Sequence, residues 1–178
     1  MATISKKICM IGDFGVGKTS LIRRFVDRQF NDAYLSTVGV KISRKLLELT
    51  EVQQQENQNL QLLIWDLEGH TKFKSIAPSY LQGSSGAIIV ADVNRIETLE
   101  RLPEHIQLFL SVNPKSSFII ALNKSDLIDE EKLEKLIQLV KEKEGLERVT
   151  AVYQTSAKTG LSVDEIFHKL AYKSIEAT

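Results

Sequence analysis

The chain carries a group of residues suited to binding phosphate between positions 12 and 20. This stretch, GDFGVGKTS, holds three glycines, one lysine and two hydroxyl side chains. Gly12, Gly17, Lys18 and Thr19 match the pattern of a glycine, four residues, a second glycine, a lysine and a serine or threonine. Glycines let successive backbone N–H groups turn inward, and the N-terminus of a following helix adds partial positive charge. The pattern therefore predicts a polyphosphate cradle in which Lys18 reaches the β- and γ-phosphates and the Thr19 hydroxyl ligates Mg²⁺.

Two polar turns later in the chain indicate which base accompanies the phosphates. Residues 123–126 read NKSD and follow the apolar segment FIIAL, and a second turn, TSAKTG, follows the short segment AVYQ. A carboxylate at Asp126 can accept two hydrogen bonds from the N1–H and N2–H₂ edge of guanine, whereas adenine would leave it unpaired at a cost of about 1–3 kcal/mol. Either turn alone is an ordinary polar loop. Together with the phosphate pattern they predict a guanine nucleotide.

The segments that must position these residues alternate between strand and helix patterns. Short apolar runs rich in branched residues predict buried strands at 6–11, 86–93 and 117–123. Apolar side chains at helical spacing predict helices around 21–26, 133–140 and 166–171. This alternation is typical of an α/β sandwich around a mostly parallel sheet.

A hairpin is predicted at one edge of that sheet. Residues 38–49 and 60–66 have the character of two paired strands, and the polar run TEVQQQENQ at 50–58 predicts a solvated tip between them. We find no linker, internal repeat or change of composition that would divide the chain. Residues 1–178 are therefore expected to form a single domain.

Composition limits the classes of partner and compartment. The 178 residues include 23 lysines and arginines and 23 aspartates and glutamates, so no overall field attracts nucleic acid or anionic lipid. The single cysteine, Cys9, lies in an apolar run and fits a reducing compartment. No stretch approaches the roughly 18 apolar residues of a membrane span, and the first residues lack the apolar core of a signal peptide. We expect a cytoplasmic protein.

The motifs together resemble those of the small GTPases of the Ras superfamily, nearest the Rab branch. The resemblance covers residues 5–173 and rests on five stretches in order: GDFGVGKT, STVG, WDLEGH, NKSD and TSAK. It implies a P-loop NTPase sandwich with a six-stranded, mostly parallel sheet, one antiparallel edge strand and helices on both faces. It also implies a monomeric switch that binds GTP or GDP with Mg²⁺ and slowly hydrolyses GTP to GDP and phosphate.

The resemblance assigns roles around the base. Asn123 and Asp126 are expected to fix the guanine, the stem of Lys124 to pack over it, and the N–H of Ala157 to meet the guanine O6. Phe30 matches an aromatic that stacks edge-on against the base, and its alternative role is a core side chain at the end of the first helix. The implied nucleotide-binding residues are Asp13, Gly15, Val16, Gly17, Lys18, Thr19, Ser20, Phe30, Tyr34, Thr37, Gly69, Asn123, Lys124, Asp126, Ser156, Ala157 and Lys158.

The resemblance also implies two segments that respond to the γ-phosphate. Thr37 is expected to ligate Mg²⁺ together with Thr19, and Asp66 to hold the metal through water. The N–H of Gly69 would contact the γ-phosphate, so loss of that phosphate would release both segments. The catalytic residues implied are Lys18, Gly69 and His70. His70 stands where most Ras and Rab proteins carry a glutamine that orients water, and its alternative role is a solvated loop histidine.

Other departures from the family pattern leave alternatives open. Phe14 occupies a position that faces the γ-phosphate, where its ring should crowd an arginine from an activating protein, unless the ring turns outward. Leu67 and Glu68 replace a threonine and an alanine. Because of these changes, a hydrolysis-deficient, nucleotide-bound interaction module is the alternative function. A nucleoside-phosphate kinase or ATPase is disfavoured by NKSD and TSAK.

Partner and membrane expectations follow from the same resemblance. An exchange factor, an activating protein and an effector are expected to bind through residues 34–42, Trp65 and residues 68–80. Ile42, Trp65 and Tyr80 fall where Rab proteins carry an aromatic triad, or else they are packing residues on the sheet surface. The last residues lack a cysteine for prenylation and position 2 is not glycine, so no intrinsic membrane anchor is expected in this chain. Peripheral recruitment to a membrane would then need a partner or a lipidated tail outside this sequence.

Overall fold

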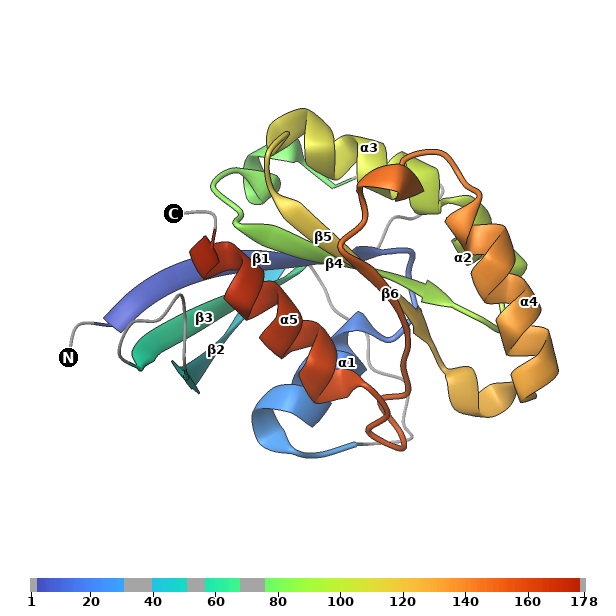
Figure 1. Ribbon diagram of the computed structural model, residues 1–178, viewed down its shortest axis with the longest axis horizontal. Helices are drawn as coiled ribbons and strands as arrows, with labels where there is room; N and C mark the ends of the chain where they lie inside the picture. The colour runs from blue at the N-terminus through green and yellow to red at the C-terminus, as the bar shows by residue number, and fades with distance from the viewer. Residues whose placement is uncertain (1–2, 31–39, 51–56, 68–75, 177–178) are drawn as a thin grey trace.

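A computed structural model describes residues 3–30, 40–50, 57–67 and 76–176. Within them, six strands form one sheet in the order β2-β3-β1-β4-β5-β6 (Figure 1). The strands are β1 (Thr3–Gly12), β2 (Val40–Leu49), β3 (Gln58–Leu67), β4 (Gly86–Asp92), β5 (Ser117–Asn123) and β6 (Ala151–Gln154). All neighbouring pairs are parallel except β2 with β3, so the predicted sheet with one antiparallel edge strand is confirmed.

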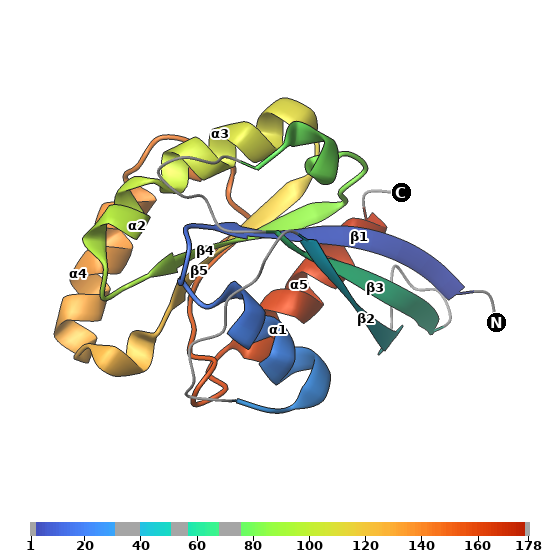
Figure 2. The ribbon, with the colours of Figure 1, turned by 180° about the vertical axis from the view of Figure 1, so that it is seen from behind.

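Helices cover both faces of the sheet (Figures 1 and 2). They are α1 (Lys18–Asp27), α2 (Ile96–Glu100), α3 (Leu102–Val112), α4 (Glu130–Lys141) and α5 (Val163–Glu176). Helices α1 and α5 pack on one face, where Phe25 and Phe167 stack with ring centroids 4.2 Å apart. Helices α2, α3 and α4 pack on the other face around Phe109 and Phe118. Helices α2 and α3 were not predicted.

Strand composition explains why the sheet is covered on both sides. Every residue of β4, GAIIVAD, is buried, and its alternate side chains enter the two opposite cores. Such a continuous apolar run is typical of a parallel strand with helices above and below it. Strand β2, at the edge, instead alternates exposed and less exposed side chains.

The parallel register brings the ends of three strands to the same edge of the sheet. Gly12 at the end of β1 pairs with Val90 of β4, and Asp92 at the end of β4 pairs with Asn123 at the end of β5. Open α/β sheets bind ligands outside the carboxyl ends of their strands. The phosphate pattern and the NKSD turn, more than 100 residues apart in sequence, therefore meet at this edge.

Candidate functional site

The phosphate loop, residues 12–17, runs from the end of β1 to the start of α1 and leaves no room for side chains at two glycines. A Cβ on Gly12 would lie 2.4 Å from the Val90 carbonyl oxygen. A Cβ on Gly17 would lie 2.3 Å from Asn123 Nδ2, and the φ of 103° at Gly17 also favours glycine. These glycines let the loop press against β4 and β5.

Lys18 begins α1 and is almost fully buried beneath this loop, with 6% of its surface exposed. Its Nζ donates to the carbonyl oxygens of Gly12 (3.0 Å) and Asp13 (3.1 Å). Burial lowers the pKa of Lys18 from 10.5 to about 8, against the opposing effect of the carboxylates of Asp66 and Asp13. A buried ammonium held only by carbonyls and distant carboxylates is a strong site for an anion.

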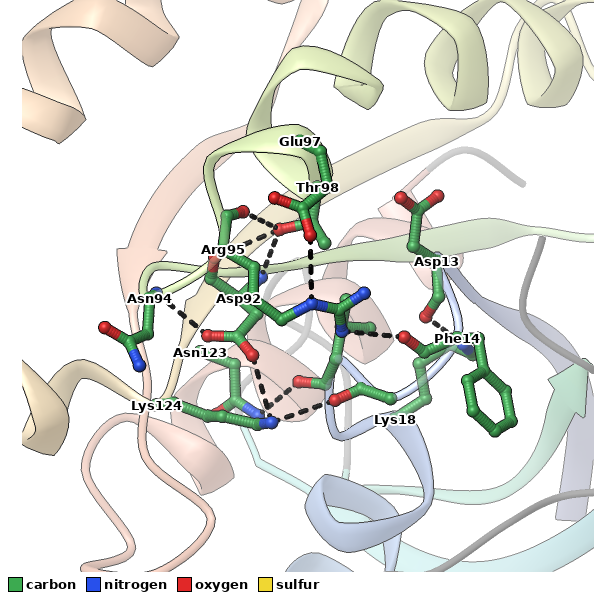
Figure 3. Close-up of polar contacts among 12 residues, drawn as sticks. Asp13, Phe14, Lys18, Asp92, Asn94, Arg95, Glu97, Thr98, Asn123 and Lys124 are labelled. Atoms are coloured by element: carbon green, nitrogen blue, oxygen red, sulfur yellow. Dashed lines mark hydrogen bonds and ion pairs between the residues drawn. The ribbon is translucent and has the colours of Figure 1, made fainter. Parts of the chain in front are cut away.

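The remaining carbonyls of the loop are each held from outside by another group (Figure 3). Arg95 Nη1 donates to the Phe14 oxygen (2.8 Å) and Lys124 Nζ to the Gly15 oxygen (2.9 Å). Asn123 Nδ2 donates to the Val16 oxygen (2.9 Å), and the Gly17 oxygen accepts from the first turn of α1. Because the carbonyls are turned outward, the loop's N–H groups are available to face a ligand.

A second buried network ties the loop to α3. Asp13 and His105 are both buried, and His105 Nε2 lies 2.8 Å from Asp13 Oδ1. Arg101 Nε lies 3.6 Å from the other carboxylate oxygen. The Asp13 side chain thus points toward α3, and its contribution to the site is to fix the first half of the loop.

Thr19 and Asp66 bring two oxygen groups together beside the loop. The Thr19 hydroxyl donates to Asp66 Oδ2 at 2.5 Å, and Asp66, near the end of β3, is 1% exposed. Hydroxyl and carboxylate oxygens are the ligands that Mg²⁺ prefers, with phosphate oxygens and waters completing its shell. The donor set of these two residues therefore fits a magnesium ion. Among the described residues, no group of three or more histidine, cysteine, aspartate or glutamate side chains is placed to hold a metal ion.

The NKSD turn is fixed on both sides. Asn123 Oδ1 accepts from the Thr155 hydroxyl at 3.0 Å, while its amide reaches the phosphate loop. The Ser156 hydroxyl donates to Asp126 Oδ1 at 2.8 Å. Asp126 is exposed to solvent and carries one oriented carboxylate. The two turns predicted to bind the base are therefore adjacent, and they share hydrogen bonds.

Lys124 is placed by a residue that the sequence did not single out. Asp92 ends β4 and is 2% exposed. Its Oδ2 lies 3.0 Å from Lys124 Nζ, and its Oδ1 accepts a hydrogen bond from the Asn94 N–H. Lys124 itself has a φ of 63° in the left-handed region. The carboxylate and the Gly15 carbonyl hold the ammonium at the loop, which leaves the lysine stem along the side of the site.

The structure also describes four other residues that were predicted to bind the nucleotide. Ala157 is buried, and Lys158 offers its carbonyl oxygen to Arg24 of α1 at 3.2 Å. Ser20 lies in the first turn of α1. Phe30 is partly buried and packs against the core under α1 and α5, which favours its alternative role as a core side chain.

The predicted γ-phosphate-responsive segments lie outside the described residues. Tyr34, Thr37, Glu68, Gly69 and His70 all fall there, so their roles stay predictions.

The predicted aromatic surface is only partly exposed. Ile42 and Tyr80 are 47% and 44% exposed, whereas Trp65 is partly buried. Lys7 Nζ lies 3.7 Å from the centre of the Trp65 ring and donates to the carbonyl oxygens of Tyr80 and Gln82. Ile42 pairs with Trp65 across β2 and β3. Ile42, Trp65 and Tyr80 therefore lie close to one another.

Comparison with known proteins agrees with this geometry. A family described as "Ras of Complex, Roc, domain of DAPkinase" matches residues 7–126. The human "Ras-related protein Rab-22A" is 33% identical over 96% of this chain and 84% of its own length. The Arabidopsis thaliana "Ras-related protein RABF2b" is 35% identical over 95% of this chain and 80% of its length, and the Schizosaccharomyces pombe "GTP-binding protein ypt5" is 34% identical over 97% and 79%.

The chain belongs to the Rab-like small GTPases of the Ras superfamily. It is thus a GTP-binding, GTP-hydrolysing molecular switch, and the hydrolysis-deficient alternative is not favoured. Rab-like GTPases bind guanine nucleotide together with regulators and effectors. No helix in the described ranges is long and apolar enough to cross a membrane.

Several residues of the site were not found from the sequence. Asp92, Arg95 and His105 belong to none of the recognised motifs, yet each bonds to a motif residue. One signal was available for Asp92, since an acidic residue that ends a buried strand at the ligand edge is unusual. For Arg95 and His105 the contact depends on how the β4–α2 turn and α3 lie against the loop.

Proposed function

We propose that this GTPase binds GTP and GDP at the edge formed by the phosphate loop, the NKSD turn and residues 156–158. The observation that carries the proposal is the direct bonding between motifs, with Asn123 and Lys124 each donating to a carbonyl of the phosphate loop. Base recognition and phosphate binding are thereby built as one rigid unit. Residues 1–178 act as a single domain, supported by the one sheet and its two covering layers.

The base is selected at the NKSD turn. Asp126 accepts the N1–H and N2–H₂ donors of guanine through the carboxylate that Ser156 orients, and the Ala157 N–H donates to the guanine O6. The Lys124 stem lies over the ring because its ammonium is held by Asp92.

The phosphates are held by the loop and by Lys18. The N–H groups of residues 13–20 and the Lys18 ammonium bind the β- and γ-phosphates. Thr19 and, in the GTP state, Thr37 would ligate Mg²⁺ directly, and Asp66 would hold it through water. The bound ion would neutralise phosphate charge. The Gly69 N–H contacts the γ-phosphate, and His70 orients the attacking water.

Signalling follows from the loss of the γ-phosphate. The segments around Thr37 and Gly69 are tethered to GTP and released in the GDP state, which changes the surface formed by residues 34–42, Trp65 and residues 68–80. An exchange factor, an activating protein and an effector bind that surface. We place this monomeric switch in the cytoplasm, consistent with its buried, unpaired Cys9.

The test is phosphate release from GTP by purified protein, followed for several hours with and without Mg²⁺. Slow release that requires Mg²⁺ and is inhibited by excess GDP but not by excess ADP is expected. Ras-type intrinsic rates are about 10⁻⁴ s⁻¹, so the assay needs single-turnover conditions. Equal inhibition by ADP would contradict guanine selection. Tight GTP binding without phosphate release would support the interaction-module alternative.

A further inference from the structure

Arg95 reaches the phosphate loop from outside every recognised motif. It lies on the turn between β4 and α2, and its Nη1 donates to the Phe14 carbonyl oxygen at 2.8 Å (Figure 3). Its Nε pairs with Glu97 at 3.3 Å, and 38% of its side chain is exposed.

The turn that carries Arg95 is itself firmly held. The Arg95 N–H donates to the Asp92 carbonyl oxygen at 3.0 Å, and the Thr98 hydroxyl donates to the Arg95 oxygen at 2.7 Å. The same hydroxyl accepts from the Asp92 N–H at 2.9 Å, and Thr98 is 1% exposed. The backbone from which the guanidinium extends is therefore fixed relative to β4, and so relative to the loop.

Peptide geometry connects this contact to the phosphate site. The Phe14 carbonyl and the Gly15 N–H belong to one planar trans peptide, so they point in opposite directions. An arginine that holds the carbonyl on the outer side of the loop aims the Gly15 N–H toward the inner side. Gly15 has a φ of 76°, a conformation that glycine adopts without strain but that needs outside contacts to be selected.

The neighbouring carbonyls of the loop are fixed by residues of the recognised motifs: Lys18, Lys124 and Asn123. The Phe14 carbonyl oxygen, by contrast, accepts from Arg95, a residue outside these motifs. Arg95 therefore contributes to the orientation of the Gly15 N–H.

We infer that Arg95 is a positioning residue for GTP hydrolysis, because it orients the Gly15 N–H toward the phosphates. The inference rests on the proposed nucleotide site. Charge shifts among the phosphate oxygens as the γ-phosphoryl group departs, and a fixed donor stabilises that change more than it stabilises bound GDP. Loss of Arg95 should therefore slow hydrolysis more than it weakens GDP binding.

The experiment compares wild type with Arg95→Ala, Arg95→Lys and Arg101→Ala. Arg101 is a matched control because its side chain is also 38% exposed and lies near the loop, but it faces the Asp13 carboxylate and no loop carbonyl. Single-turnover GTP hydrolysis, GDP affinity and the amide resonance of Gly15 in glycine-labelled, GDP-bound protein are measured for each protein.

Arg95→Ala should lower the hydrolysis rate roughly tenfold, the effect of one partly exposed charged hydrogen bond, with a smaller change in GDP affinity. The Gly15 amide proton should move upfield because its hydrogen bond to phosphate weakens. Arg95→Lys, which keeps one charged donor, should recover part of both effects. Arg101→Ala should shift the Gly15 resonance much less than Arg95→Ala does.

Three results would overturn the inference. They are an unmoved Gly15 resonance in Arg95→Ala, an equal loss of hydrolysis and GDP affinity, or the same resonance shift in Arg101→Ala. Failure of the wild type to bind GDP would overturn the proposed site as well. If the wild type binds GDP normally and Arg95→Ala has the wild-type hydrolysis rate and Gly15 resonance, only the role of Arg95 is overturned.

Discussion

Nucleotide binding to this protein should take up a proton at mildly alkaline pH. The pKa of Lys18 is about 8 in the structure, chiefly because the ammonium is buried. Phosphate oxygens placed beside the ammonium favour its charged form and raise this pKa. Above pH 8 a growing fraction of Lys18 is neutral before binding and must be protonated to hold the phosphates.

The magnitude follows from the fraction of neutral Lys18. With a free pKa of about 8 and an ammonium that stays fully charged when the nucleotide is bound, binding takes up about 0.1 proton at pH 7, 0.5 at pH 8 and 0.9 at pH 9. The affinity for GDP should accordingly fall about tenfold between pH 7 and pH 9. The sign is fixed by the direction of the shift, because the bound state holds more protons than the free state.

Isothermal titration calorimetry in pairs of buffers with different ionisation enthalpies measures this uptake directly. Lys18→Arg is the control, since a guanidinium stays charged over the whole range and the ligand is the same. The difference in proton uptake between the two proteins should grow from pH 7 to pH 9. A wild type that takes up no more protons than Lys18→Arg at pH 9 would refute the reasoning.

Three further outcomes are expected. Lys18→Met should abolish nucleotide binding but stabilise the free protein at pH 7 by on the order of 3 kcal/mol, because it removes a buried ammonium whose pKa falls from 10.5 to about 8. Thermal unfolding of the variant should therefore show a higher Tm than that of the wild type. An unchanged Tm would contradict the cost of burying the ammonium. That advantage should shrink as the pH rises from 8 to 10.5, where the wild-type lysine becomes neutral in the folded state. Asp92→Asn should speed GDP dissociation roughly tenfold by releasing Lys124, measured by displacement of a fluorescent GDP analogue; an unaltered rate would remove Asp92 from the site. His70→Ala should slow hydrolysis without loss of GTP affinity, measured by single-turnover phosphate release; equal rates in the two proteins would exclude catalysis by His70.

The fold could be predicted largely because its signals are local. Buried parallel strands such as β4 and β5 appear as short apolar runs, and the glycines of the phosphate loop are required by contacts that the motif pattern encodes. Lys18 and Asp126 could also be predicted, because each belongs to a short motif that is visible in the sequence. Helices α2 and α3 were missed, since α2 is only five residues long and a proline stands near the start of α3.

The supporting residues of the site could not be predicted, because their contacts are made across the fold. Asp13 meets His105 over 92 positions of sequence, and Phe14 meets Arg95 over 81. Nothing in the local pattern around His105 or Arg95 distinguishes them from ordinary helix and turn residues. Only the packing of α3 and of the β4–α2 turn against the loop assigns them a role.

Exchange of base preference at Asp126 tests the central claim most directly. The wild type should bind GDP far more tightly than either xanthosine diphosphate (XDP) or ADP. Asp126→Asn should lose GDP affinity and prefer XDP, because the C2 carbonyl of xanthine needs a donor where guanine needs an acceptor. Ser156→Ala is a useful companion, since it removes the hydroxyl that orients Asp126 and keeps the carboxylate, so its preference should remain for GDP. Unchanged GDP affinity in Asp126→Asn would contradict the assignment of the guanine site.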